Sequence, residues 1–485
     1  MNADNPHYDN RWKILVILGI AQLMVVLDAT IVNIALPSAQ KALHFTNDNR
    51  QWIVTAYALA FGSLLLVGGR ISDYFGRKWT FVAGLAGFAV ASAIGGAAQS
   101  FTELVAARTF QGAFAALLAP AALSLLTTTF TDDRERNKAF GVYSAIAGSG
   151  ASVGLLLGGV LTQYLSWRFS MYVNLVFAAI AVAGALVLLH NQAAVDRPKL
   201  DVPGAVTVSG GLFALVYGFS HAETTSWTNP LTLGMLAGGV ALLAAFVWIE
   251  SHVSKPLLPL RVVTDRNRGA SFLSIGISGA AMFGVFLFLT YYLQQTRGYS
   301  PVSTGLAFLP MTALVMVSAV IGNTRLRPRF GPRILVVAGM LLGASGMYYL
   351  TNLGLASSYV TDILPALLAM GVGIGLVISS SMSSATLGVE PRDAGVASAS
   401  VSASQQVGGS IGTALLSTLA ASAATSMLAG SRPTPALLAH AAIHGYTTAF
   451  AWAAAIFAVG AIVAAVLFER GVPSVQVSGE PVLAH

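Results

Sequence analysis

Long apolar stretches alternate with short polar segments along almost the whole chain. Most of them have about 17–25 residues, which is the length that an α-helix needs to cross the hydrocarbon core of a bilayer. The pattern predicts an all-α polytopic membrane protein with fourteen spans. They lie near 13–36, 51–69, 79–99, 103–126, 138–162, 169–190, 203–220, 231–250, 269–292, 302–323, 333–353, 361–388, 393–424 and 443–468.

Two segments of the chain resemble each other at a constant offset of 255 residues. Phe75–Leu85 and Phe330–Met340 are identical at five of eleven positions, and each enters a predicted span. Two halves in the same orientation indicate parallel repeats about an axis along the membrane normal. Chance is the alternative, because matches of Gly, Ala and Val are common in membrane helices.

A duplication of six spans leaves one pair of spans over, near 203–250. We therefore expect an insertion between two bundles. The predicted domains are an N-terminal six-helix bundle at 1–190, a two-helix insertion at 200–255, a C-terminal six-helix bundle at 265–470 and a cytoplasmic tail at 471–485.

Basic residues fall between the spans in a way that sets the orientation. With a cytoplasmic N-terminus, 20 of the 26 Lys and Arg residues lie in inside segments, and one, Arg108, lies within a span. Such a bias follows the positive-inside rule and places both termini in the cytoplasm. The five expected outside are Lys41, Arg50, Arg168, Arg297 and Arg432.

Composition supports a membrane protein and excludes several functions. Only 9% of the residues are charged, against about 25% in soluble domains. There is no Cys, which excludes disulfides, thiolate metal sites and a cysteine nucleophile. No GKS/T phosphate-binding loop and no Ser-His-Asp set appear, so we expect no enzyme, no cofactor and no metal. The net charge of +7 follows from orientation signals and does not indicate nucleic acid.

Asp28 is the one carboxylate expected deep in the bilayer. It lies about 22 Å from the inner end of the first span at 1.5 Å per residue. An ionisable group at that depth is costly and is functional by default, and a carboxylate there can bind and release a proton. The alternative is a structural Asp satisfied by neighbouring hydroxyl groups.

Arg108 is the expected partner of Asp28. It lies about 8 Å below the outer surface on the fourth span, at nearly the same depth. Gln111, Gly112 and Ala115 share its helical face, which suits a lumen wall beside a close helix contact. A snorkelling Arg is the alternative.

The loop between the second and third spans has the strongest local motif. Its glycines permit tight turns, and its carboxylate and basic side chains suit charge pairs that latch one conformation and break in another. A plain basic orientation loop is the alternative. The predicted gating residues are Gly69, Arg70, Asp73, Gly76, Arg77 and Lys78.

These motifs resemble the major facilitator superfamily, and specifically its fourteen-span drug:proton antiporter branch, over nearly the whole chain. The resemblance implies a proton-driven exporter without a cofactor, with its loop motif between spans two and three. It is carried by Leu27–Pro37, Gly69–Lys78, Arg108, Gln111, Gly112, Tyr291–Gln295, Gly298–Pro301, Gly305, Pro310, Asp393–Gly395 and Gln406–Gly409.

Two departures from the family pattern affect this expectation. The antiporter signature of the fifth span has Leu155 where Pro is expected, so that helix should be straighter and antiport is less firmly implied. The second copy of the loop motif, Gly322–Arg333, has no Asp, so its latch should be weaker than the first.

A substrate cavity is expected between the halves, where the superfamily binds substrate. The candidate lining residues are polar or aromatic positions on spans that face the midplane. They are Thr30, Asn33, Gln111, Met282, Phe286, Tyr291, Tyr292, Gln294, Ser381 and Gln405.

We therefore expect secondary export of hydrophobic drugs or antibiotics across the cytoplasmic membrane, coupled to protons through Asp28 and Arg108. The expected partners are the lipid bilayer, protons and a lipophilic small molecule, and the expected state is a monomer. Alternatives are export or proton symport of one metabolite, a membrane sensor on the same fold, and an embedded enzyme.

Overall fold

The computed structural model describes residues 9–46, 49–130, 132–190, 201–253, 256–387, 389, 394–429 and 434–471. All regular elements in these residues are helical, so the predicted all-α fold is confirmed. Residues 472–485 of the predicted tail, and Asp393 of the family motif, lie outside the described residues.

Fourteen of the described α-helices have 20 or more residues, and they follow the predicted ranges closely. They are α1 (Arg11–Leu43), α2 (Gln51–Phe75), α3 (Arg77–Ala97), α4 (Phe101–Thr129), α5 (Asp133–Tyr164), α6 (Phe169–Leu188), α7 (Val202–Thr224), α8 (Pro230–His252), α10 (Arg266–Tyr291), α11 (Pro301–Ile321), α12 (Arg327–Tyr349), α13 (Leu364–Thr386), α14 (Ala394–Leu428) and α15 (Pro435–Leu467). A short helix, α9 (Leu260–Thr264), precedes α10.

Length and apolarity identify eleven stretches of the described chain that can each cross a membrane. One of them, Pro301–Asn352, runs over both α11 and α12, and two shorter apolar helical stretches lie in α2 and α5. The protein is therefore a multi-pass membrane protein, while the number of fourteen crossings stays a prediction.

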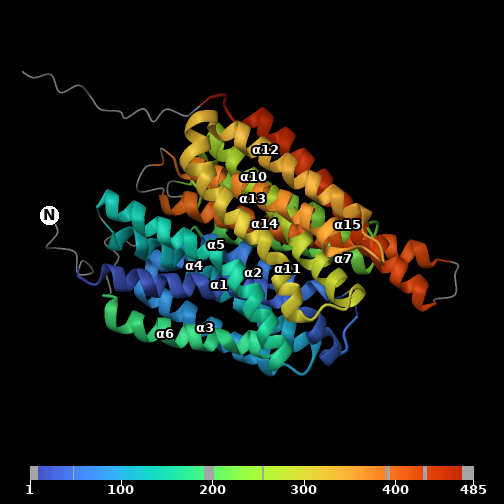
Figure 1. Ribbon diagram of the computed structural model, residues 1–485. Helices are drawn as coiled ribbons and strands as arrows, with labels where there is room; N and C mark the ends of the chain where they lie inside the picture. The colour runs from blue at the N-terminus through green and yellow to red at the C-terminus, as the bar shows by residue number, and fades with distance from the viewer. Residues whose placement is uncertain are drawn as a thin grey trace, which may run out of the picture.

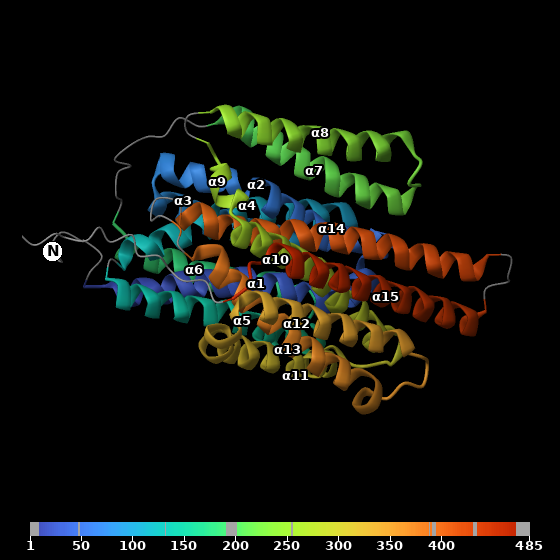
Figure 2. The same cartoon turned by 90° about the horizontal axis from the view of Figure 1, so that it is seen from above.

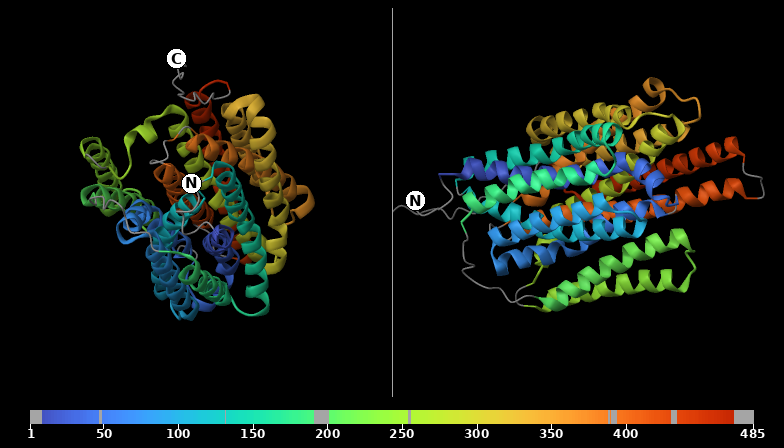
Figure 3. Two further views of the ribbon diagram at one scale, coloured as in Figure 1. Left: turned by 90° about the vertical axis from the view of Figure 1, so that its left-hand side faces the viewer. Right: turned by 90° about the horizontal axis from the view of Figure 1, so that it is seen from below.

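The helices are arranged in two bundles with a separate hairpin. Figure 1 shows α1–α6 lying together beside the bundle that contains α10–α15. The hairpin of α7 and α8 lies at one edge, where α7 contacts α2 and α14 (Figures 2 and 3). One apolar core fills the N-terminal bundle around Leu85, Phe88 and Leu118, and a larger one fills the C-terminal bundle and reaches the outer part of α1.

The internal repeat has a structural counterpart. Gly76 has φ 92° and Gly331, which is 255 residues later, has φ 74°. Residues other than glycine rarely adopt a positive φ of this size, so glycine is needed at both turns. A shared backbone turn at equivalent positions supports duplication over chance similarity.

Glycines on α5 allow close contact with α1, the helix that carries Asp28. A β-carbon on Gly150 would lie 3.1 Å from Val26 Cβ, and one on Gly154 would lie 3.2 Å from Leu27 Cα. Small residues at this spacing let two backbones approach, which is a common basis of helix association in membranes. The contact fixes α1 against α5 next to Asp28.

Gly112 makes a similar contact between α4 and α2. A β-carbon there would lie 3.0 Å from both Ala60 Cβ and Phe61 N, and it would also meet the carbonyl oxygen of Tyr57. We expect Gly112→Ala to destabilise the protein by about 1–3 kcal/mol, because backbone atoms must move to make room. A lower thermal unfolding midpoint in detergent would show it.

Gly234→Ala is the matched control, because nothing lies within 4 Å of a β-carbon at that position. Its unfolding midpoint should stay the same or rise slightly, since Ala is the better helix former. Equal midpoints for the two variants would contradict the packing argument.

Candidate functional site

An ion pair lies buried inside the N-terminal bundle. Asp28 on α1 is 0% exposed and Arg108 on α4 is 1% exposed. Arg108 Nη1 donates to Asp28 Oδ2 at 2.5 Å. The two residues that the sequence placed at one depth are thus in direct contact, and the snorkelling alternative for Arg108 does not hold in this structure.

Two amide side chains complete the hydrogen bonds of the carboxylate. Gln111 Nε2 donates to Asp28 Oδ1 at 3.2 Å, and Asn174 Nδ2 on α6 donates to the same oxygen at 2.7 Å. Ser92 Oγ on α3 accepts from Gln111 at 2.7 Å and from Asn174 at 3.3 Å. Donors from two helices therefore surround Asp28, and a hydroxyl group of a third orients both amides.

Arg108 is held equally firmly. Its Nε donates to the carbonyl oxygen of Ile53 at 3.1 Å, and its Nη1 donates to Gln111 Oε1 at 2.8 Å. Its guanidinium carbon lies 4.4 Å from the ring centroid of Tyr57, a cation–π contact. A buried charge is tolerated when it is paired and hydrogen-bonded, and both charges of this pair are.

Sequence reasoning missed Asn174, Ser92 and Tyr57 as members of this site. Asn174 is the only amide side chain in the apolar stretch Phe169–Leu188, and that isolation was the available signal. Two atoms of the site, Asn174 Oδ1 and Tyr57 OH, are buried without a hydrogen-bond partner. Two polar atoms of the site can therefore form further hydrogen bonds.

The predicted gating loop lies between α2 and α3. Lys78 Nζ donates to the carbonyl oxygens of Leu186 at 3.1 Å and Leu189 at 2.5 Å, so it caps the end of α6. This contact lies within the N-terminal bundle and is not the carboxylate pair that we expected for Lys78. The side chains of Arg70 and Asp73 lie outside the described residues, so the latch stays a prediction.

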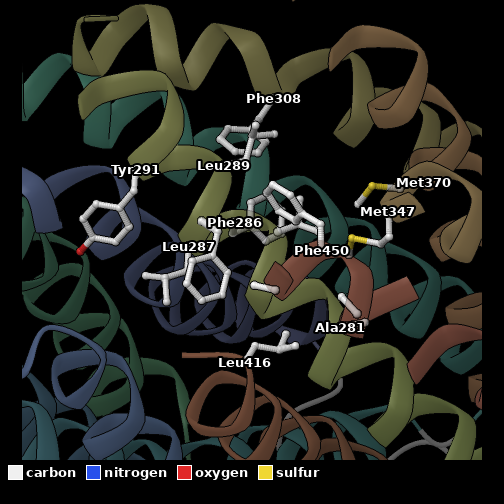
Figure 4. Packing of buried hydrophobic residues seen from close by; sticks show 14 of the residues in the cluster. Ala281, Phe286, Leu287, Leu289, Tyr291, Phe308, Met347, Met370, Leu416 and Phe450 are labelled. Atoms are coloured by element: carbon white, nitrogen blue, oxygen red, sulfur yellow. The ribbon is translucent and has the colours of Figure 1, made fainter. Parts of the chain in front are cut away.

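The candidate cavity residues of the C-terminal bundle lie in its apolar core. Figure 4 shows Phe286 and Tyr291 among the packed side chains, with the Tyr291 hydroxyl group turned toward the blue helices of the other bundle. The rings of Phe286 and Phe308 have centroids 5.3 Å apart. Tyr292 OH donates to the carbonyl oxygen of Gly354 at 2.6 Å, and Met282 packs against the same core.

The polar candidates are dispersed. Thr30 and Asn33 donate to carbonyl oxygens of their own helix, at 3.0 Å and 3.4 Å. Ser381 is buried with no partner for its hydroxyl group, and Gln405 is exposed. Gln111 belongs to the Asp28 site. None of the ten candidates lines the cavity beside Arg266 and Arg333 or the one beside Val32 and Trp167, and a common substrate cavity stays a prediction.

Several polar contacts join the two bundles at the end predicted to face outside. Arg50 Cζ lies 3.5 Å from the ring centroid of Tyr291. Gln294 Nε2 donates to the carbonyl oxygen of Ile34 at 3.2 Å, and Val302 N donates to Gln163 Oε1 at 3.3 Å. The outer ends of the bundles are therefore closed against each other.

Leu155 takes part in this closure. α5 is one helix from Asp133 to Tyr164 with no proline inside it. A β-carbon on Gly305 of α11 would lie 2.6 Å from the carbonyl oxygen of Leu155. The residue at the position of the expected proline thus lies at the α5–α11 contact between the bundles.

Comparison with known proteins identifies relatives of the whole chain. The family model described as Major Facilitator Superfamily matches residues 18–413. The chain is 47% identical to the puromycin resistance protein pur8 of Streptomyces alboniger, over 97% of this chain and 93% of that protein. It is 37% identical to the cephamycin export protein CmcT of Amycolatopsis lactamdurans, over 84% and 85%.

A solved structure shares the fold. It is a bacterial homologue of the human lysosomal transporter Spinster in an inward-facing, unoccupied conformation, with a TM-score of 0.65 and 16% sequence identity. The match covers 94% of this chain and 96% of that one.

We expect Arg108→Gln to destabilise the protein by about 3–5 kcal/mol, because it leaves the carboxylate of Asp28 buried without its counter-charge. The double variant Asp28→Asn/Arg108→Gln should recover a large part of this loss, since neither charge is then present. Thermal unfolding of the purified variants measures both effects.

Arg325→Gln is the control, because Arg325 is an exposed arginine on the other half of the chain. It should leave the unfolding midpoint unchanged. If the double variant were less stable than Arg108→Gln, the ion pair would not be the source of the effect.

Proposed function

The chain belongs to the Major Facilitator Superfamily of membrane transporters, and we propose that it is a proton-coupled exporter of hydrophobic drugs or antibiotics. It exchanges protons that enter across the cytoplasmic membrane for substrate that leaves. The transporter works as a monomer without a cofactor, and both of its termini lie in the cytoplasm.

The observation that carries this proposal is the buried Asp28–Arg108 pair. A carboxylate with 0% exposure inside a membrane bundle must keep a cationic partner or take up a proton. Asp28 therefore either pairs with Arg108 or binds a proton. In this structure it is paired with Arg108.

Protonation of Asp28 changes the hydrogen bonds of the site. A neutral carboxyl group attracts Arg108 less strongly and needs an acceptor for its new proton. Asn174 Oδ1 is a buried acceptor without a partner, and rotation of that amide presents it to Asp28. Proton binding thus loosens α1 from α4 and shifts the balance between two arrangements of the bundle.

Alternating access then requires the outer contacts to open. The bundles meet there through the Arg50–Tyr291 contact and through single hydrogen bonds, and each of these can break without unfolding a helix. A proton from outside reaches Asp28 when this end opens, and it leaves to the cytoplasm when the other end opens.

The relatives support an antibiotic or a similar lipophilic compound as the substrate. Four of them are named for resistance to, or export of, puromycin, cephamycin, tetracenomycin C and lincomycin. Because each of these names refers to one compound, a dedicated exporter of a single antibiotic is the second candidate. A transport screen with a panel of lipophilic compounds distinguishes the two.

We expect Asp28→Asn to abolish substrate accumulation against a gradient in everted membrane vesicles energised with a pH difference. The amide keeps the size of the side chain and cannot take up a proton. Puromycin serves as the first probe, and its accumulation is measured with and without a protonophore. Wild-type accumulation should collapse when the protonophore is added.

Asp265→Asn is the control variant, because Asp265 is a partly exposed carboxylate that caps α10 far from the site. It should accumulate substrate like the wild type. Normal, protonophore-sensitive accumulation by Asp28→Asn would refute the assignment of Asp28 as the coupling group.

A further inference from the structure

The α7–α8 hairpin has two carboxyl groups at the same end. Asp201 immediately precedes α7, and Glu250 lies in the last turn of α8. This is the end at which the hairpin joins the rest of the chain, and positive-inside counting places it on the cytoplasmic side (Figure 2). The mechanism proposed for Asp28 does not use either residue.

Both side chains are buried although they lie at helix ends. Asp201 is 6% exposed and Glu250 is 4% exposed. Asp201 Oδ1 accepts from Gly204 N at 3.0 Å and so caps α7. Glu250 accepts from the backbone of the following segment, from Leu257 N at 3.3 Å and Leu258 N at 3.0 Å.

The remaining oxygen of Asp201 has no donor. Asp201 Oδ2 is buried without a hydrogen-bond partner. A β-carbon on Gly204 would contact this oxygen and would also lie 2.9 Å from Glu250 Oε1. Two oxygens that can only accept therefore face the same small space, which is a repulsive arrangement when both carboxyl groups are ionised.

The surroundings of the pair are apolar. Ala205, Val208, Phe246 and Leu257 form a buried cluster at this end of the hairpin, and Val67 of α2 packs against it.

Among the described residues, neither carboxyl group forms an ion pair. The side chain of Arg70 on α2 and residues Lys199 and Lys255 lie outside the described part of the chain.

We propose that Asp201 and Glu250 form a second proton-binding site, which holds one proton between the two carboxyl groups at neutral pH. A shared proton turns the repulsive oxygen pair into a hydrogen bond, as in other buried carboxyl pairs. A metal ion fits less well, because both oxygens of Glu250 already accept backbone N–H groups and the described residues hold no cluster of three potential ligands.

The proton makes the attachment of the hairpin conditional on pH. Glu250 ties down Leu257 and Leu258, which lead into α9 and then α10 of the C-terminal bundle. Loss of the proton places two negative charges in contact, and this repulsion favours release of the 256–259 segment or of the cap on α7. Proton binding by Asp201 and Glu250 does not depend on whether Asp28 couples transport to protons.

Infrared difference spectroscopy of the full-length protein in lipid nanodiscs tests the site. As the buffer is changed from neutral to alkaline pH, the wild type should lose a carbonyl-stretch band of a protonated carboxyl group. Asp201→Asn and Glu250→Gln should each lack this band, because the introduced amide donates the missing hydrogen bond permanently and the remaining carboxylate stays ionised. Either variant alone is sufficient if the other does not fold.

Two further variants separate this site from other carboxyl groups. Asp265→Asn replaces another helix-capping Asp that is partly exposed and paired with Arg268, and it should keep the band. Asp28→Asn should also keep it, which distinguishes failure of this proposal from failure of the coupling mechanism. Persistence of the band in Asp201→Asn or in Glu250→Gln would overturn the proposal, as would its absence from the wild type at neutral pH.

Thermal unfolding gives an independent measurement. The native wild type binds a proton that the unfolded carboxylates lack at neutral pH, so its stability should fall as the pH rises until that proton is lost. One extra proton corresponds to a tenfold change of the unfolding equilibrium constant per pH unit. The two amide variants should lose this dependence. A sodium-dependent midpoint in the wild type, with no pH dependence, would instead indicate a cation site and refute the shared proton.

Discussion

The buried ion pair between Asp28 and Arg108 is the constraint on which the N-terminal bundle depends. Removing two charges from water costs several kcal/mol per ion, and their attraction offsets this cost only when the remaining hydrogen-bonding groups are also satisfied. Helices α2, α3, α4 and α6 supply those groups around α1. The close contact at Gly112 holds α4 against α2, and the close contact at Gly154 holds α1 against α5. The hydrogen bonds of the Asp28 site therefore depend on the helix packing around it.

Much of this arrangement could be predicted from the sequence, because the information is carried by periodicity and depth. Apolar length defined the helices, and the depth of Asp28 and Arg108 on spans of opposite direction placed them together. The repeat predicted two bundles, and the left-handed turns at Gly76 and Gly331 agree with it. The contacts of Asn174 could not be predicted, because a single polar residue in an apolar helix does not reveal which neighbour its side chain faces.

Asp201 and Glu250 were missed for a different reason. Charged residues at helix ends are normally solvated, so their positions in the sequence indicated nothing unusual. Their burial results from the way the hairpin folds back onto the segment 256–259, a tertiary contact with no local signal. The substrate cavity stays a prediction. Phe286, Tyr291 and Tyr292 were chosen by residue type, and the structure packs them in a core that is closed in this conformation.

Buried polar groups without a hydrogen-bond partner bear on how the molecule can move. Among the described residues they occur in both bundles, and they include Tyr57 OH and Asn174 Oδ1 in the N-terminal bundle and the hydroxyl groups of Thr290, Tyr291 and Ser381 in the C-terminal bundle. Such groups cost free energy in a closed core and gain hydrogen bonds when water or a polar part of a substrate reaches them. The closed conformation is therefore disfavoured locally at these positions in both bundles.

The polar contacts of the outer closure are comparable in strength to the available driving force. One cation–π contact contributes about 0.5–2 kcal/mol and a typical hydrogen bond about 0.5–1.5 kcal/mol, so the contacts of Arg50, Gln294 and Gln163 together amount to a few kcal/mol. Moving one proton through a potential of 100 mV supplies about 2.3 kcal/mol. The energy of one proton is thus comparable to that of the polar contacts that must break when the outer end opens, while the packing of α5 against α11 adds to the closure. Among the described residues, the ion pair whose two partners are both buried lies within the N-terminal bundle and not between the bundles, so the outer end can open without breaking it.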